Sequence, residues 1–114
     1  MALNIGAFID FDPNDKEAWS QFNLIHMLAH QSEYQAMLDA GYAMKVFPLD
    51  ADLDDIDNWL GLNYTEHISQ YDLLGLSGLP DLSNVDMNDP DQFHNWMLLH
   101  YGVHLRVDQT LGLA

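Results

Sequence analysis

Cysteine is absent from this 114-residue sequence, and only three of its residues are lysine or arginine. Without cysteine the chain has no disulfide framework, no thiolate nucleophile and no sulfur ligands for zinc or an iron–sulfur cluster. The three basic residues, Lys16, Lys45 and Arg106, are far apart in the sequence and form no patch for a nucleic-acid backbone. The sequence also has no apolar run of roughly 18 residues, the length that a membrane-spanning helix needs. We therefore expect neither direct nucleic-acid binding nor a membrane protein.

Acidic residues dominate the charge. The sequence has 18 Asp and Glu residues, which give a formal net charge of -15 and a pI near 4.1. A surface of this sign repels nucleic acid and anionic lipid and attracts basic proteins. An alternative interpretation is that the charge only keeps a small protein soluble. Basic protein surfaces are the predicted class of partner, in an oligomer or a larger assembly.

The apolar content is high enough for a folded core. Hydrophobic residues make up 48% of the sequence and aromatic residues 11%, unlike a disordered chain. The length fits a single domain, residues 1–114. The N-terminal stretch MALNIGAFID lacks the basic region and the long apolar region of a secretory signal. This pattern predicts a cytoplasmic protein of a prokaryote or a phage-infected host cell, or a virion protein.

A pattern recurs three times at an interval of 37 residues. His30, His67 and His104 are separated by this interval, and so are several of their neighbours. The aligned sets are Phe22 with Trp59 and Trp96, Trp19 with Ile56 and Phe93, and Asp15 with Asp52 and Asp89. A fixed period of this length is typical of repeated supersecondary units. We therefore expect three helix-plus-linker repeats of about 37 residues, near 1–40, 41–77 and 78–114.

Each repeat carries the signals of one long helix. An Asp at position 15, 52 or 89 can cap the first N–H groups, and Pro90 suits a first turn. Gly75 and Gly112 follow the last apolar turn, where a left-handed residue commonly ends a helix. The signals predict an all-α three-helix bundle, with helices near 16–40, 53–74 and 90–111 and an N-terminal extended arm, ALNIGAFIDF. The linkers leave an up-down-up and a parallel, pseudo-threefold arrangement open, and loop lengths favour the antiparallel one.

Polar residues recur on the inward side of these expected helices. At 100° per residue, the positions 11 and 15 residues after each aligned Asp fall inside the apolar stripe. They hold His26, Asn63 and His100 at the first position, and His30, His67 and His104 at the second. Histidines four residues apart on one helix face can bind the same metal ion. The candidate metal ligands are therefore His26, His30, His67, His100 and His104, and the only carboxylates near the stripe are Glu33 and Glu66.

A packing role for these imidazoles is favoured over a metal site. Buried rings that bond to one another, or to Asn63, Tyr64 or Tyr101, satisfy their polar atoms. Such networks can set the register of helices without doing chemistry. This interpretation predicts no cofactor, and a melting temperature that a chelator leaves unchanged. His94 lies off the stripe and is expected in solvent.

Two resemblances bear on function. The HxxxH pairs resemble hemerythrin-like proteins, helical bundles whose histidines and carboxylates hold two irons, although the fourth helix and the paired acids of that family are missing here. The helix starts FDPND and VDMNDPDQF, together with the small size and the acidity, resemble small accessory and structural proteins encoded among the assembly genes of tailed phages. The second resemblance implies a virion or head–tail component.

Catalytic signatures are missing from the sequence. Its hydroxyl residues lie outside any nucleophile-elbow pattern, and no Gly-rich phosphate loop follows a predicted strand. We therefore expect a non-enzymatic protein–protein interaction or assembly protein, with a phage virion or head–tail component as its particular form. One alternative is an acidic mimic of nucleic acid that inhibits a DNA-binding defence or regulatory protein. The other is a His-rich, metal-binding helical domain.

Overall fold

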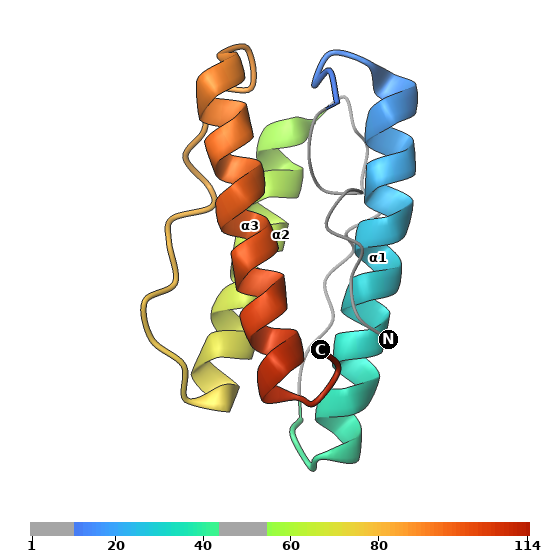
Figure 1. Ribbon diagram of the computed structural model, residues 1–114, viewed down its shortest axis with the longest axis vertical. Coiled ribbons are helices and arrows are strands. Elements are labelled where there is room, and N and C mark those ends of the chain that lie inside the picture. The colour runs from blue at the N-terminus through green and yellow to red at the C-terminus, as the bar shows by residue number, and fades with distance from the viewer. Residues whose placement is uncertain (1–10, 44–54) are drawn as a thin grey trace.

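The computed structural model describes residues 11–43 and 55–114 of the chain (Figure 1). Helix α1 spans Lys16–Asp39, α2 spans Ile56–Leu74 and α3 spans Pro90–Thr110. Within these two ranges there is no strand, which confirms the all-α prediction and fits a bundle of three helices. None of the described helices is long and apolar enough to span a membrane. The predicted N-terminal arm lies almost entirely outside the described residues.

All three helices run in the same direction. Each begins at the top of Figure 1 and ends at the bottom, and the segment from α2 to α3 returns along the length of the bundle. Side-chain contacts agree, because Trp19 near the start of α1 has its ring 5.6 Å from Trp59 near the start of α2. Near the other ends, Gln70 of α2 donates to Glu33 of α1 at 2.9 Å. The favoured antiparallel arrangement is therefore wrong.

The length of the connection explains why the parallel arrangement is accessible. Helix α2 has 19 residues, so it is about 28 Å long at the rise of an α-helix. The connection over residues 75–89 can span about 50 Å when extended, which is more than enough to reach back to the level where α2 begins. Leu82 in this connection is fully buried and accepts a hydrogen bond from Trp96 Nε1 at 2.8 Å. The returning chain is thus part of the core.

The N-terminal caps agree with the predicted signals in two helices and differ in the third. Asp15 caps α1 and Asp89 caps α3, each accepting two backbone N–H groups. Helix α2 is capped by Asp55, which accepts from the N–H of Asn58, so the helix begins at Ile56 and the prediction of Asp52 as its cap is wrong. Asp52 itself lies outside the described residues. The run ADLDD offers several acids that could cap a helix, and the 37-residue interval selected the wrong one.

Glycines end two of the helices as predicted. Gly75 is the C-cap of α2 and has φ 68°, in the left-handed region. Gly112 has φ 76° and follows Leu111, the C-cap of α3. Both positions favour glycine because other residues pay a steric cost at positive φ.

Aromatic side chains fill the end of the bundle where the helices begin. The ring of Phe11 makes edge contacts with those of Trp19, Phe22 and Phe93 at 5.2 to 5.4 Å. Trp59 is fully buried and donates its indole N–H to Asn23 at 2.9 Å. Trp96 follows Phe93 by one turn of α3, and its ring stacks on that of His100 with the centroids 4.6 Å apart. This aromatic layer therefore covers one side of the histidine cluster.

Candidate metal centre

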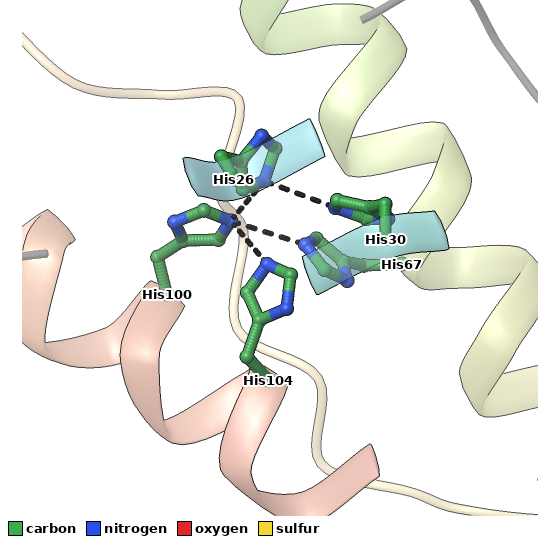
Figure 2. Close-up of side chains that lie close together, drawn as sticks. All are labelled: His26, His30, His67, His100 and His104. Atoms are coloured by element: carbon green, nitrogen blue, oxygen red, sulfur yellow. Dashed lines mark hydrogen bonds between the residues drawn. The ribbon is translucent and has the colours of Figure 1, made fainter. Parts of the chain in front are cut away.

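All five candidate histidines meet in the centre of the bundle (Figure 2). Helix α1 supplies His26 and His30, α2 supplies His67, and α3 supplies His100 and His104. His30 is 7% exposed and the other four are fully buried. One ring nitrogen from each residue lies within 4.8 Å of all the others. The predicted inward orientation is confirmed, and His94 is exposed as expected.

The Nε2 atoms converge on a single point. His100 Nε2 lies 3.2 Å from that of His26 and 3.1 Å from those of His67 and His104. The amide nitrogen of Asn63 lies 3.3 Å from the same atom. A ring nitrogen either donates one hydrogen or accepts through one lone pair, so His100 Nε2 cannot bond all four neighbours. Hydrogen bonding among the imidazoles therefore explains only part of the arrangement.

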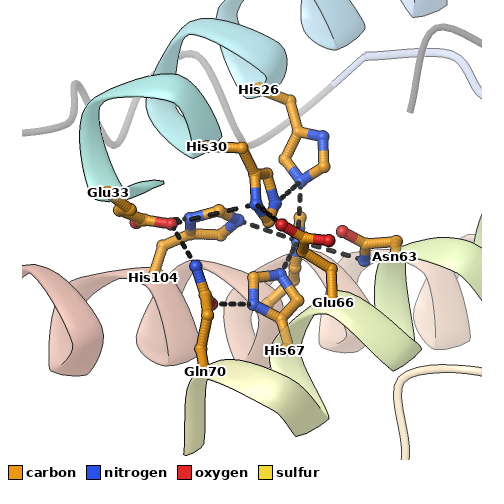
Figure 3. A network of polar contacts seen from close by, with 9 residues as sticks. His26, His30, Glu33, Asn63, Glu66, His67, Gln70 and His104 are labelled. Carbon is orange, nitrogen blue, oxygen red and sulfur yellow. Dashed lines mark hydrogen bonds and ion pairs between the residues drawn. The ribbon is translucent and has the colours of Figure 1, made fainter. Parts of the chain in front are cut away.

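The outer hydrogen bonds orient His67 and His104 (Figure 3). Gln70 donates from Nε2 to Glu33, so its oxygen accepts the hydrogen of His67 Nδ1 at 2.7 Å. His104 Nδ1 lies 2.9 Å from the other oxygen of Glu33 and donates to it. With hydrogen on Nδ1, the Nε2 atom of each ring carries a lone pair. Both lone pairs are directed at His100 Nε2, as metal ligands are directed at an ion.

Burial keeps the rings neutral. Loss of solvation is the largest cause that lowers the pKa of His26, His30, His67 and His100 well below 6.5, and repulsion between charged rings lowers it further. Burial also lowers the pKa of His104, to about 3, although Asp108 opposes the shift. Neutral imidazole is the form that binds metals. At neutral pH a metal ion would therefore not have to displace protons from charged imidazoles in order to bind.

Carboxylates lie near the Nδ1 atoms of two imidazoles, on the side away from the centre of the cluster. Besides its contact with His104, Glu33 has an oxygen 3.9 Å from His30 Nδ1, and Glu66 has one at the same distance. Burial raises the pKa of Glu33 to about 7, and burial with a hydrogen bond to Glu33 raises that of Asp108 to about 8. The hemerythrin resemblance implies carboxylates that bind the irons themselves. Glu33 instead orients an imidazole, as outer residues of metal sites commonly do.

The rings occupy five corners of an octahedron. Eight pairs of imidazoles have their centroids 4.4 to 5.1 Å apart, whereas His26 and His67 are 6.4 Å apart. Five corners of an octahedron make eight adjacent pairs and two opposite ones, and the eight short separations with the long one between His26 and His67 fit that shape. Adjacent donors at metal–nitrogen distances of 2.0–2.1 Å lie about 3.0 Å apart. The closest Nε2 pairs, at 3.0 to 3.2 Å, agree with that spacing.

Sequence reasoning missed Gln70 and Asp108, which are buried beside the cluster. Gln70 follows Glu33 by the same 37 residues that separate the histidines, and the two are bonded in the structure. Asp108 follows His104 by four residues, which places it on the same face of α3. The interval and the helical spacing were therefore the signals that could have identified both.

Comparison with protein-family models, with curated proteins and with solved structures finds no match to this chain. The site is therefore the basis for assigning a function.

Proposed function

We propose that the protein binds one divalent transition-metal ion through the Nε2 atoms of its five central histidines, and that the ion fastens the three helices together. One observation carries this proposal: His100 Nε2 has four nitrogen neighbours within 3.3 Å and can hydrogen-bond only one of them. A cation at the common centre would bind the lone pairs that otherwise face one another. This proposal departs from the expectation that the imidazoles only pack.

The donor set limits the metal. Imidazole nitrogen suits Zn²⁺, Cu²⁺, Fe²⁺, Co²⁺ and Ni²⁺, whereas Ca²⁺ and Mg²⁺ prefer oxygen ligands. The five rings are almost completely buried, and a closed, ligand-rich site is typical of a structural metal, because a catalytic one keeps an open position. We assign the ion a structural or storage role.

Metal binding would be coupled to assembly of the bundle. Each of the three helices contributes at least one imidazole, so the full set of ligands exists only when all three are packed. Under the proposal, the 37-residue repeat is the origin of this arrangement, because it would place two equivalent inward positions on each parallel helix. The free energy of metal binding then adds to the stability of the fold.

The proposal is tested by one substitution inside the cluster and one outside it on the same helix. Isothermal titration with Zn²⁺, Co²⁺ or Ni²⁺ chloride should give one site per chain for the tag-free protein after EDTA has removed bound metal and has itself been dialysed away. His100→Ala should abolish that site, since this ring touches most of the others, and His94→Ala should leave it intact, since His94 is exposed. Equal binding by both variants would contradict the proposal.

As a second candidate function we propose the interaction or assembly role, which is compatible with an internal metal. Leu24 and Leu28 lie one turn apart on α1 and are 61% and 57% exposed. Exposed apolar side chains on a chain with a formal net charge of -15 suit a basic partner that also buries hydrophobic groups. Capture of partners from a lysate of infected cells, at low and at high salt, tests this role. Binding that fails to weaken as salt rises would remove the acidic surface from recognition.

A further inference from the structure

Five imidazoles leave one corner of the octahedron, and Asn63 lies beside it. Within the 37-residue pattern, His26, Asn63 and His100 hold one position, and His30, His67 and His104 hold the position one helical turn later. Three parallel helices that each present two such positions form two triangles of donors, which together make an octahedron. Histidine fills five of the six positions, and asparagine fills the sixth.

The surroundings of Asn63 fit a ligand. The side chain is fully buried, and its Nδ2 atom lies 3.3 Å from His100 Nε2, close to the spacing between the imidazole nitrogens themselves. Its Oδ1 atom is also buried and makes no hydrogen bond of good geometry with the residues that the structure describes, although its looser contact with His30 raises the pKa of that ring. An unsatisfied buried carbonyl is costly. A half-turn of the amide exchanges the two atoms and aims the oxygen at the centre of the cluster.

We propose that Asn63 Oδ1 is the sixth ligand of the metal, and that it biases the site toward ions that readily take six ligands, Fe²⁺, Co²⁺ and Ni²⁺, over Zn²⁺. The proposal rests on the metal-binding function above. Zn²⁺ is bound almost always by four ligands in structural sites, so a sixth donor adds little for it. For an octahedral ion the same oxygen completes the shell.

The visible spectrum of bound Co²⁺ reports how many ligands the ion has. The wild-type full-length chain should show the weak absorption of six-coordinate Co²⁺. Asn63→Leu should give the several-fold stronger absorption of a five-coordinate ion, and its Co²⁺ affinity should fall by at least about tenfold, the lower end of what loss of even an outer-shell partner costs. Its Zn²⁺ affinity should change less. Asn23→Leu is the control, since Asn23 is a buried asparagine of α1 that bonds Trp59 outside the cluster.

A second variant separates a ligand from a hydrogen-bond donor. Asn63→Asp keeps an oxygen and adds charge, so it should bind Co²⁺ at least as tightly as the wild type and keep the weak spectrum. If Asn63 acted only by donating from Nδ2 to His100, Asn63→Asp would weaken Co²⁺ binding as much as Asn63→Leu, and the inference would be wrong. If Asn63→Leu does not fold, Asn63→Asp is compared with the wild type instead, and a clear loss of Co²⁺ affinity in Asn63→Asp would show that the inference is wrong.

The failure of each proposal can be recognised separately. If the wild type binds none of Co²⁺, Ni²⁺ and Zn²⁺, the metal-binding function is wrong, and the inference falls with it. If the wild type binds Co²⁺ with a five-coordinate spectrum that Asn63→Leu leaves unchanged, the metal-binding function stands and the sixth ligand does not.

Discussion

His67 and His100 place their Nε2 atoms 3.1 Å apart, although the two residues come from different helices. Gln70 holds the hydrogen of His67 on Nδ1, so the inner nitrogen of His67 offers a lone pair. The inner nitrogen of His104 offers another to the same atom. Because a single ring nitrogen can bond only one of these two lone pairs, the contact between His67 and His100 supports the proposal that a metal ion lies at the centre of the cluster.

The carboxylate behind His104 should tune the affinity for metal. Glu33→Gln retains the size of the side chain and loses one of the two oxygens that accept from His104 and Gln70. Loss of such outer hydrogen bonds commonly lowers metal affinity by about 10 to 100-fold, and titration calorimetry should show a decrease in that range. Glu17→Gln, an exposed change on the same helix, should leave the affinity unchanged. If the two variants bind metal equally, Glu33 does not support the site.

Metal-free protein should be most stable at about neutral pH. The histidine pKa values are lowered from 6.5 in the folded state, so protons favour the unfolded chain and stability falls as pH drops below 6.5. The raised values of about 7 for Glu33 and about 8 for Asp108 act in the opposite direction. The folded state retains protons that the unfolded carboxyls lose above about pH 4, so these two groups lower stability as pH rises from there to about 7 and 8. Above pH 6.5 the unfolded histidines no longer gain protons, so this decrease is then the main effect.

Urea unfolding of the chelator-treated protein across this range measures the effect. Glu33→Gln should make the decrease in stability above pH 6.5 shallower and the rise below it steeper, because it removes one carboxyl of raised pKa and no histidine. A stability that rises steadily from neutral to alkaline pH would show that the buried carboxyls are not protonated in the folded state.

Substitution by alanine should change stability in opposite directions at two glycines, one at the C-terminal end of α2 and one inside it. Gly75 ends the helix at φ 68°, and a Cβ there would meet no atom within 4 Å, so the cost of Gly75→Ala is that of the backbone alone, about 1 kcal/mol. Gly61 lies inside the helix, is exposed and is equally unobstructed. Gly61→Ala should stabilise the protein by roughly 0.5–1 kcal/mol. Thermal unfolding measures both changes, and destabilisation by Gly61→Ala would contradict the helix assignment at this position.

Local signals predicted most of the helix boundaries. The ends of α1 and α3 agree with prediction to within a residue or so, because Asp15 and Asp89 cap these helices at the positions that the 37-residue alignment gave. The predicted start of α2 was too early, because several neighbouring acids can each cap the N-terminus of a helix. The inward orientation of the histidines followed from helical periodicity alone.

The direction of the helices and the convergence of the ligands could not be predicted in the same way. A helix shows the same periodicity whether it runs up or down, so the pattern at His30, His67 and His104 did not select the parallel arrangement. Whether three inward residues meet depends on how far each helix is shifted along its axis. The hydrogen bond from Gln70 to Glu33 depends on that shift too, and this is why Gln70 had no visible role in the sequence.

Metal content and its effect on stability give the most direct test of the metal centre. The full-length chain, purified without a histidine tag, should contain about one divalent transition-metal ion per molecule by elemental analysis. EDTA should remove the ion and lower the melting temperature by several degrees or more, since 1 kcal/mol corresponds to roughly 4–8 °C in a domain near this size. Added Co²⁺ or Ni²⁺ should restore it. A protein that contains no metal, and whose melting temperature neither EDTA nor these ions change, would show that the five imidazoles only pack.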